Sequence, residues 1–190
     1  MEKIEAFRKL LEQENRKYNL ISRRSFDATF ESLVAQSKLI YENIQPFSSL
    51  IDIGSGAGFP GLVIKILDDS KEVVLVEPSK KKASFLQMAV KELGLEGVEV
   101  LRADFGLARK MMKEAGRSFD YLTCIGIKHK EKFIEKPRDF IKKGYAFITG
   151  EAEVERLRRI KKLQNFSWKV VKVFGKERIF LVIITKKWEK

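Results

Sequence analysis

The chain has 190 residues, 44% hydrophobic and 34% charged, which is typical of a single folded globular domain. No apolar run approaches the roughly 20 residues that cross a bilayer, and one cysteine cannot form an internal disulfide framework. The formal net charge is +12, and residues 128–190 carry 19 basic and 8 acidic side chains, so nearly all of the excess lies in the last third. We expect a cytoplasmic monomer without a membrane partner. We also expect the basic last third of the chain to attract a polyanion.

Two helices are expected before any strand. Apolar side chains recur at helical spacing over residues 2–18 and again over residues 26–44. Pro46 and the serines that follow it mark a boundary. We therefore expect an N-terminal helical extension over residues 1–48 and a larger α/β domain over residues 49–190, together forming one compact unit.

Strands and helices alternate after this boundary. Short apolar strands are expected at 50–53, 73–76, 98–101, 119–124 and 145–148, joined by helices at 60–67, 79–93, 106–115 and 130–142, with another helix at 151–164. This alternation predicts a parallel sheet with right-handed crossovers. Two final strands, 168–174 and 178–185, are separated by a three-residue turn with a glycine and predict an antiparallel hairpin. The whole pattern is typical of the α/β, seven-stranded, Rossmann-like sheet of class I methyltransferases.

A glycine-rich loop, Asp52-Ile-Gly-Ser-Gly-Ala-Gly-Phe-Pro-Gly61, follows the first predicted strand. Glycines take positive φ and let the backbone approach a ligand closely. The spacing Gly-x-Gly-x-Gly is not the Gly-x-Gly-x-x-Gly of dinucleotide-binding proteins, and Pro60 removes an N–H that a pyrophosphate would use. The loop favours an amino acid joined to a nucleoside, as in S-adenosylmethionine.

Acidic side chains close the next two predicted strands. Glu77 follows the second strand, where a carboxylate accepts hydrogen bonds from both ribose hydroxyls, and Asp104 follows the third, where it accepts from the adenine amino group. Ligands of open α/β sheets bind at the carboxyl ends of the strands. The predicted S-adenosylmethionine site therefore contains the two acids and the loop residues Gly54, Ser55, Gly56 and Gly58.

Several segments resemble one family, the ribosomal RNA small-subunit methyltransferase G family (RsmG/GidB). The similar segments are Ile51 to Leu62, Lys17-Tyr-Asn-Leu-Ile21, Lys81-Lys-Ala-Ser-Phe-Leu86, Glu92-Leu-Gly-Leu95, Phe119-Asp120 and Glu177-Arg178, of which Gly-Phe-Pro-Gly at 58–61 is the most specific. The resemblance implies methyl transfer to N7 of a guanine in small-subunit (16S) ribosomal RNA. It also implies that Gly54, Phe59, Ala103 and Asp104 line the cofactor site.

The chain departs from this family at the end of the fourth predicted strand. Arg-Ala is usual there, whereas this chain has Ile125-Gly126. The resemblance implies that the arginine contacts cofactor or substrate. In this chain its role is either absent or taken by Lys128 or Lys130.

The substrate is expected to be small-subunit ribosomal RNA or the assembling small subunit. Candidate RNA contacts are Arg23, Arg24, Lys128 and Lys130, and either Phe59 or Tyr121 is a candidate for stacking on a base. The N-terminal helices with Arg23 and Arg24 are expected to flank an RNA groove, of which the basic runs Lys128–Lys143 and Arg156–Lys162 form another wall. The alternative interpretation of each run is a solvated helix face.

The expected chemistry needs no catalytic side chain and no metal, because guanine N7 already carries an in-plane lone pair and the sulfonium methyl is activated by the cofactor. Cys124 lacks the Pro-Cys context of cytosine-C5 enzymes and is expected to be a buried apolar residue. Two other functions remain open: a methyltransferase acting on a small molecule, and a non-catalytic RNA-binding protein with this fold.

Overall fold

The computed structural model describes residues 2–127, 130, 133–134, 140–163, 166–173, 175–176 and 178–186. Its elements in chain order are α1 (Glu2–Tyr18), α2 (Phe26–Asn43), β1 (Ser49–Ile53), α3 (Gly61–Leu67), β2 (Glu72–Val76), α4 (Lys80–Glu92), β3 (Val98–Leu101), α5 (Phe105–Glu114), β4 (Phe119–Ile125), β5 (Ile141–Gly150), α7 (Glu151–Arg158), the 3₁₀ turn η1 (Lys161–Leu163), β6 (Phe166–Lys172) and β7 (Ile179–Lys186).

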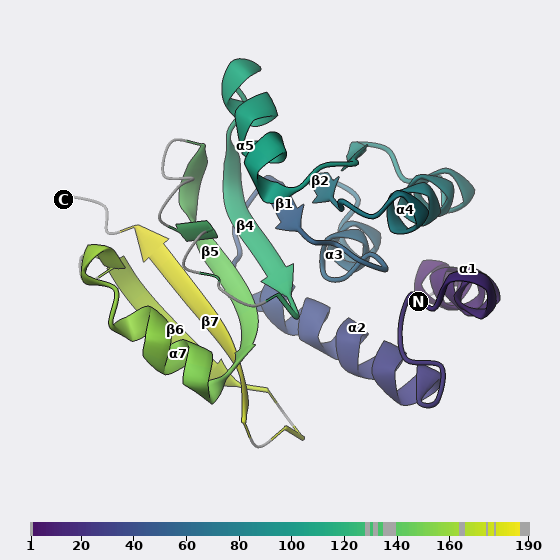
Figure 1. Ribbon diagram of the computed structural model, residues 1–190, viewed down its shortest axis with the longest axis horizontal. Helices are drawn as coiled ribbons and strands as arrows, with labels where there is room; N and C mark the ends of the chain where they lie inside the picture. Colours follow the sequence, from purple (N-terminus) through teal and green to yellow (C-terminus); the bar gives the residue numbers. More distant parts are fainter. Residues whose placement is uncertain are drawn as a thin grey trace.

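The strands form one seven-stranded sheet in the order β3-β2-β1-β4-β5-β7-β6 (Figure 1). Strands β1 to β5 pair in parallel. Strand β7 is antiparallel both to β5 and to β6, so the terminal hairpin inserts its second strand next to the parallel part. This arrangement confirms the predicted α/β sheet and its terminal hairpin.

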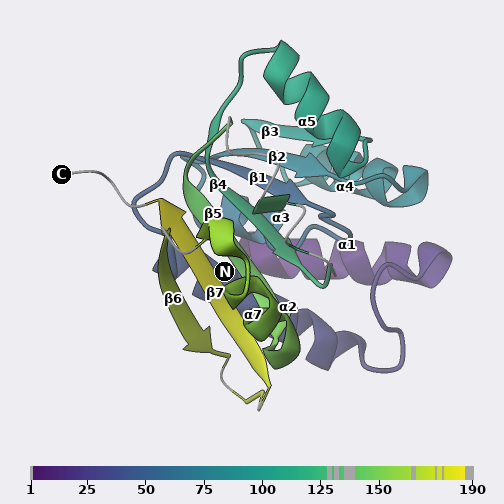
Figure 2. The ribbon, with the colours of Figure 1, turned by 60° about the vertical axis from the view of Figure 1, so that its left-hand side comes forward.

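Helices cover both faces of the sheet (Figures 1 and 2). On one face α1, α2, α3 and α4 enclose a core that contains Phe7, Phe30, Leu62 and Leu86. On the other face α5 and α7 enclose a second core, which includes Cys124. The two N-terminal helices are thus part of the first core. No helix of the described residues is both long enough and apolar enough to cross a membrane.

The structure corrects three predicted boundaries in the last third. Strand β5 begins at Ile141, which pairs with Phe119, so the helix predicted over 130–142 was wrong at its end, and most of the rest of it lies outside the described residues. Helix α7 ends at Arg158 and a separate 3₁₀ turn follows it. The connection between β6 and β7 spans residues 173–178 rather than three residues. Backbone pairing with β4 decided the start of β5, and a side-chain pattern does not report such pairing.

Candidate functional site

The glycine loop turns tightly because its backbone is tied to the neighbouring strand. The N–H groups of Gly54 and Ser55 both donate to the Val76 carbonyl of β2, at 2.8 and 3.1 Å. Gly54, Gly56 and Gly58 have φ values of 67°, 57° and 101°, in the region that favours glycine. The predicted need for glycine at these three positions is therefore met by the observed backbone.

Glu77 holds the loop from the end of β2. Its Oε2 accepts a hydrogen bond from the Gly56 N–H at 3.0 Å, and its Oε1 accepts from the Ser79 N–H at 2.9 Å. The Glu77 N–H in turn donates to the Leu101 carbonyl of β3. One buried carboxylate thus connects the glycine loop, the start of α4 and, through its own backbone, the end of β3. Each carboxylate oxygen keeps a second lone pair for a ligand.

A pocket of about 410 Å³ opens beside this loop. We call it the loop pocket, and its volume lies within the range of small-ligand sites. It collects five of the eight predicted cofactor residues: Gly54, Ser55, Gly56, Phe59 and Glu77. Sequence reasoning missed the other walls, which are Ile21, Leu33, Ala57, Pro78, Lys82 and Ile125 to Ile127. The sequence held a signal for two parts of these walls: the lysine run after Glu77, and Ile125-Gly126 at the position of the family's arginine.

The remaining predicted cofactor residues do not line the loop pocket. Gly58 and Ala103 are buried, and Asp104 is exposed beyond the end of β3. The Asp104 Oδ1 accepts from the Leu107 N–H at 2.9 Å and so caps α5. Phe59 has a structural role besides lining the pocket, because its ring packs 5.5 Å from that of Phe7. It is 4% exposed and, like Tyr121 at 7%, offers no open face for a base.

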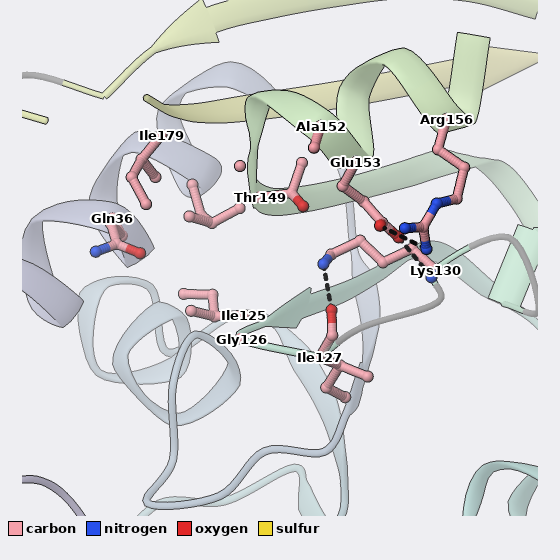
Figure 3. A pocket seen from close by; sticks show the side chains of 12 residues that line it. Gln36, Ile125, Gly126, Ile127, Lys130, Thr149, Ala152, Glu153, Arg156 and Ile179 are labelled. Carbon is pink, nitrogen blue, oxygen red and sulfur yellow. Dashed lines mark hydrogen bonds and ion pairs between the residues drawn. The ribbon is translucent and has the colours of Figure 1, made fainter. Parts of the chain in front are cut away.

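A second cavity, of about 590 Å³, lies beside the loop pocket at the carboxyl ends of β4 and β5 (Figure 3). We call it the strand-end cavity. Ile125, Gly126 and Ile127 line both spaces and form a shared wall. The polar residues on the strand-end side include Lys130, Glu153 and Arg156. Of these, Lys130 and Arg156, the first residue of the basic run Arg156–Lys162, were predicted to face RNA, and Glu153 was not. The acidic residues of α7 have the pattern of an ordinary exposed helix, so nothing in the sequence distinguished Glu153.

The predicted RNA contacts lie in different surroundings. The Arg23 guanidinium donates to the backbone carbonyls of Asn15 and Arg16, so it caps the end of α1. Arg24 is exposed. Lys130 is buried in the strand-end cavity, and Lys128 lies outside the described residues.

Asp52 is a fully buried carboxylate beneath the glycine loop. Its Oδ2 accepts from the Gly61 N–H at 3.1 Å, and its Oδ1 accepts from the Thr123 hydroxyl at 3.2 Å. These bonds fix β1, the start of α3 and β4 relative to one another. Burial away from water nevertheless dominates and raises the pKa of Asp52 to about 7.

Asp52 should make stability depend on pH. The folded chain retains this proton up to about pH 7, whereas the unfolded chain loses it near the ordinary aspartate pKa of 3.8. The Asp52 contribution to the free energy of unfolding is therefore largest below pH 4 and is lost as pH rises through 7. Relative to Asp52→Asn, the wild-type protein should lose several kcal/mol between pH 4 and 8 in urea titrations. A stability difference that stays constant over this range would contradict the assignment.

Cys124 is the only cysteine and is buried in the core between the sheet and α5 and α7. Burial raises the pKa of its thiol to about 12, so at neutral pH the thiolate, which is the nucleophilic form, is scarce. Iodoacetamide should label Cys124 only after unfolding. Cys124→Ala should keep methyl transfer within about threefold of the wild type, whereas loss of turnover with intact folding would reveal a nucleophile. No group of three or more potential metal ligands occurs among the described residues.

Comparisons with known proteins agree with this fold. The chain is 36% identical to the ribosomal RNA small subunit methyltransferase G of Syntrophomonas wolfei over 64% of its length and 56% of that protein. It is 32% identical to the corresponding protein of Moorella thermoacetica over 96% of its length and 80% of that protein. It therefore spans little more than half of the first relative and most of the second. A methyltransferase structure from Geobacter sulfurreducens superposes with a TM-score of 0.64 at 16% identity, covering 98% of this chain and 89% of that one, and so shows the fold.

The model of one family matches almost the whole chain. The match extends over residues 1–179, from the first N-terminal helix to the start of β7. It includes the glycine loop, Glu77 and both cavities. The chain belongs to the family described as rRNA small subunit methyltransferase G.

Proposed function

We propose that the protein transfers the methyl group of S-adenosylmethionine to N7 of a guanine in small-subunit (16S) ribosomal RNA. The observation that carries this proposal is the loop pocket, formed by the glycine loop and Glu77 in a chain of this family. The proposal makes the protein an RNA-binding enzyme of the cytoplasm.

The loop pocket fits such a cofactor. Gly56 lines it, and a Cβ added there would meet nothing nearer than the Gly54 carbonyl at 3.8 Å, so the space beside its backbone is open to a ligand. Glu77 would accept hydrogen bonds from the ribose hydroxyls through its remaining lone pairs. Asp104 lies outside the loop pocket and caps α5 with one oxygen, and it would accept from the adenine amino group with the other.

The reaction requires little from the protein beyond orientation. When bound, S-adenosylmethionine supplies a sulfonium methyl: the N7 lone pair forms the new C–N bond, and the electron pair of the breaking C–S bond passes to sulfur. No proton is transferred, so no general base is needed. The residues of the shared wall line both spaces and would orient the two reactants, and such positioning contributes up to about 7–11 kcal/mol to catalysis.

Two alternatives make different predictions. A methyltransferase for a small molecule would bind ribosomal RNA weakly or not at all, whereas an RNA enzyme that neutralises phosphates loses affinity steeply as salt rises. A non-catalytic RNA-binding protein would bind but would not turn over. The family match and the open loop pocket favour an active enzyme.

Labelled S-adenosylmethionine tests the proposal with small ribosomal subunits that lack the methyl group. Label should appear in the ribosomal RNA, and the rate at subsaturating substrate should fall as salt is raised. The same assay on deproteinised RNA shows whether RNA alone or the assembled subunit is the substrate. Absence of label from both substrates would contradict the proposal.

A further inference from the structure

The strand-end cavity contains a buried cation with unused hydrogen-bond donors. Lys130 is 3% exposed, and its ammonium donates to the Ile127 carbonyl, which belongs to the shared wall (Figure 3). Within the part of the chain that the structure describes, this carbonyl is its only hydrogen-bond partner. An ammonium has three donors, and a buried donor without a partner is costly. The other two protons are available to a ligand in the cavity.

A carboxylate lies next along the same cavity. Glu153, whose side chain is 12% exposed, accepts from the Lys130 backbone N–H at 3.1 Å and pairs with Arg156 at 3.1 Å. Both contacts orient the carboxylate and leave further lone pairs on its oxygens. From the shared wall outward, the cavity thus presents a donor, the Lys130 ammonium, and then an acceptor, the Glu153 carboxylate (Figure 3).

This order matches the edge of one base. Going around guanine from N7, the next groups are the O6 acceptor and then the N1–H and N2–H donors. With N7 at the shared wall, facing the loop pocket, O6 would meet Lys130 and the two donors would meet Glu153. Adenine presents the reverse pattern, with the N6 amino donor toward the ammonium and the N1 acceptor toward the carboxylate.

We propose that the strand-end cavity is the binding site of the target base and that Lys130 and Glu153 select guanine over adenine. This inference rests on the proposed function, which it deepens by naming the residues that read the substrate. The inference also accounts for the family's arginine, which this chain replaces with Ile125. Lys130 brings a positive charge to the same cavity that Ile125 lines. Extruded bases are commonly read in this way, by hydrogen bonds along the Watson–Crick edge.

Two glutamates of α7 provide a matched pair of variants. Glu153→Gln removes the charge inside the cavity, whereas Glu155→Gln removes one from the same helix at a side chain that is 55% exposed and pairs with Arg158. Glu153→Gln should reduce kcat/KM on guanine RNA by about 10- to 100-fold, with an unchanged Kd for S-adenosylmethionine. Glu155→Gln should behave as the wild type.

A base analogue separates base recognition from a merely structural role. Inosine lacks the N2 amino group, so the wild type should methylate guanine RNA at least about tenfold faster than RNA with inosine at the target position. In Glu153→Gln this preference should shrink toward one. Lys130→Met should reduce discrimination against 2-aminopurine, which lacks O6 and the N1–H, and the part of the preference that remains should reflect N1 facing Glu153. A guanine-to-inosine preference that stays at the wild-type value in Glu153→Gln would overturn the proposal.

Binding without turnover distinguishes this inference from the proposed function. In the presence of S-adenosylhomocysteine, guanosine monophosphate should shift the amide NMR signals of α7 in the wild type more strongly than adenosine monophosphate does, and this preference should be lost in Glu153→Gln. Equal shifts with both nucleotides would contradict the base site. If guanosine is preferred but no RNA is methylated, the proposed function fails and the base site stands.

Discussion

Glu77→Ala should raise the Kd for S-adenosylmethionine at least about 100-fold. The variant removes the acceptor of the Gly56 and Ser79 N–H groups, which releases the glycine loop, and it also removes the proposed ribose contact. Hydrogen bonds to charged groups contribute about 1.5–3 kcal/mol each, so losing the proposed bonds to the two ribose hydroxyls accounts for this change. Isothermal titration calorimetry measures the affinity directly.

The same strand supplies the control for Glu77. Glu72 is the first residue of β2 and is exposed, so Glu72→Ala should bind the cofactor as the wild type does. Glu77→Gln keeps the shape but offers an N–H₂ group to one of the two backbone donors, and should lose at least about tenfold. Cofactor affinity in Glu77→Ala equal to that of the wild type would show that the loop pocket is not the cofactor site.

Gly144→Ala should lower the free energy of unfolding by about 3 kcal/mol. Gly144 pairs with Thr185 of β7, and a Cβ there would lie 2.4 Å from the Ile184 carbonyl oxygen and 3.0 Å from the Thr185 Cα. These are backbone atoms of the neighbouring strand, so relief requires the two strands to separate. The expected fall in Tm is about 6–12 °C, measurable by calorimetry.

Gly150 is the matched control at the end of the same strand. Its φ is −82°, and an added Cβ would lie 3.7 Å from the Arg178 carbonyl, which is ordinary contact. Gly150→Ala should therefore cost less than about 1 kcal/mol. Equal stability of the two variants would mean that β5 and β7 are less closely paired than the structure has them.

The fold was predictable where one local signal was strong. Strand β3 was predicted at its observed bounds, Val98–Leu101, and helix α1 close to its observed bounds, Glu2–Tyr18, because apolar periodicity and flanking turns agree there. The start of β5 was not predictable: Ile141 and Lys142 fit a helix locally, and pairing with β4 makes them strand. Local propensity yields to such tertiary pairing.

The cofactor site was more predictable than the base site. The glycine loop and Glu77 lie directly after strands, and the topology of a parallel sheet brings strand ends to one edge. Glu153 lies 76 positions after Glu77, and it reaches the strand-end cavity only because β5 and β4 are neighbours. In the sequence it is one of three glutamates in α7, and only burial distinguishes it from Glu155.

A ribosomal RNA transcript made with 7-deazaguanosine tests most directly whether guanine N7 accepts the methyl group. This nucleotide keeps O6, N1–H and the N2 amino group but replaces N7 with carbon, so it fits the same pocket and has no lone pair to methylate. In small subunits assembled from unmodified transcript, the protein should transfer labelled methyl to one guanine, and in those from the 7-deaza transcript it should transfer none. Equal label in both would place the methyl on another atom and contradict the proposed guanine-N7 activity.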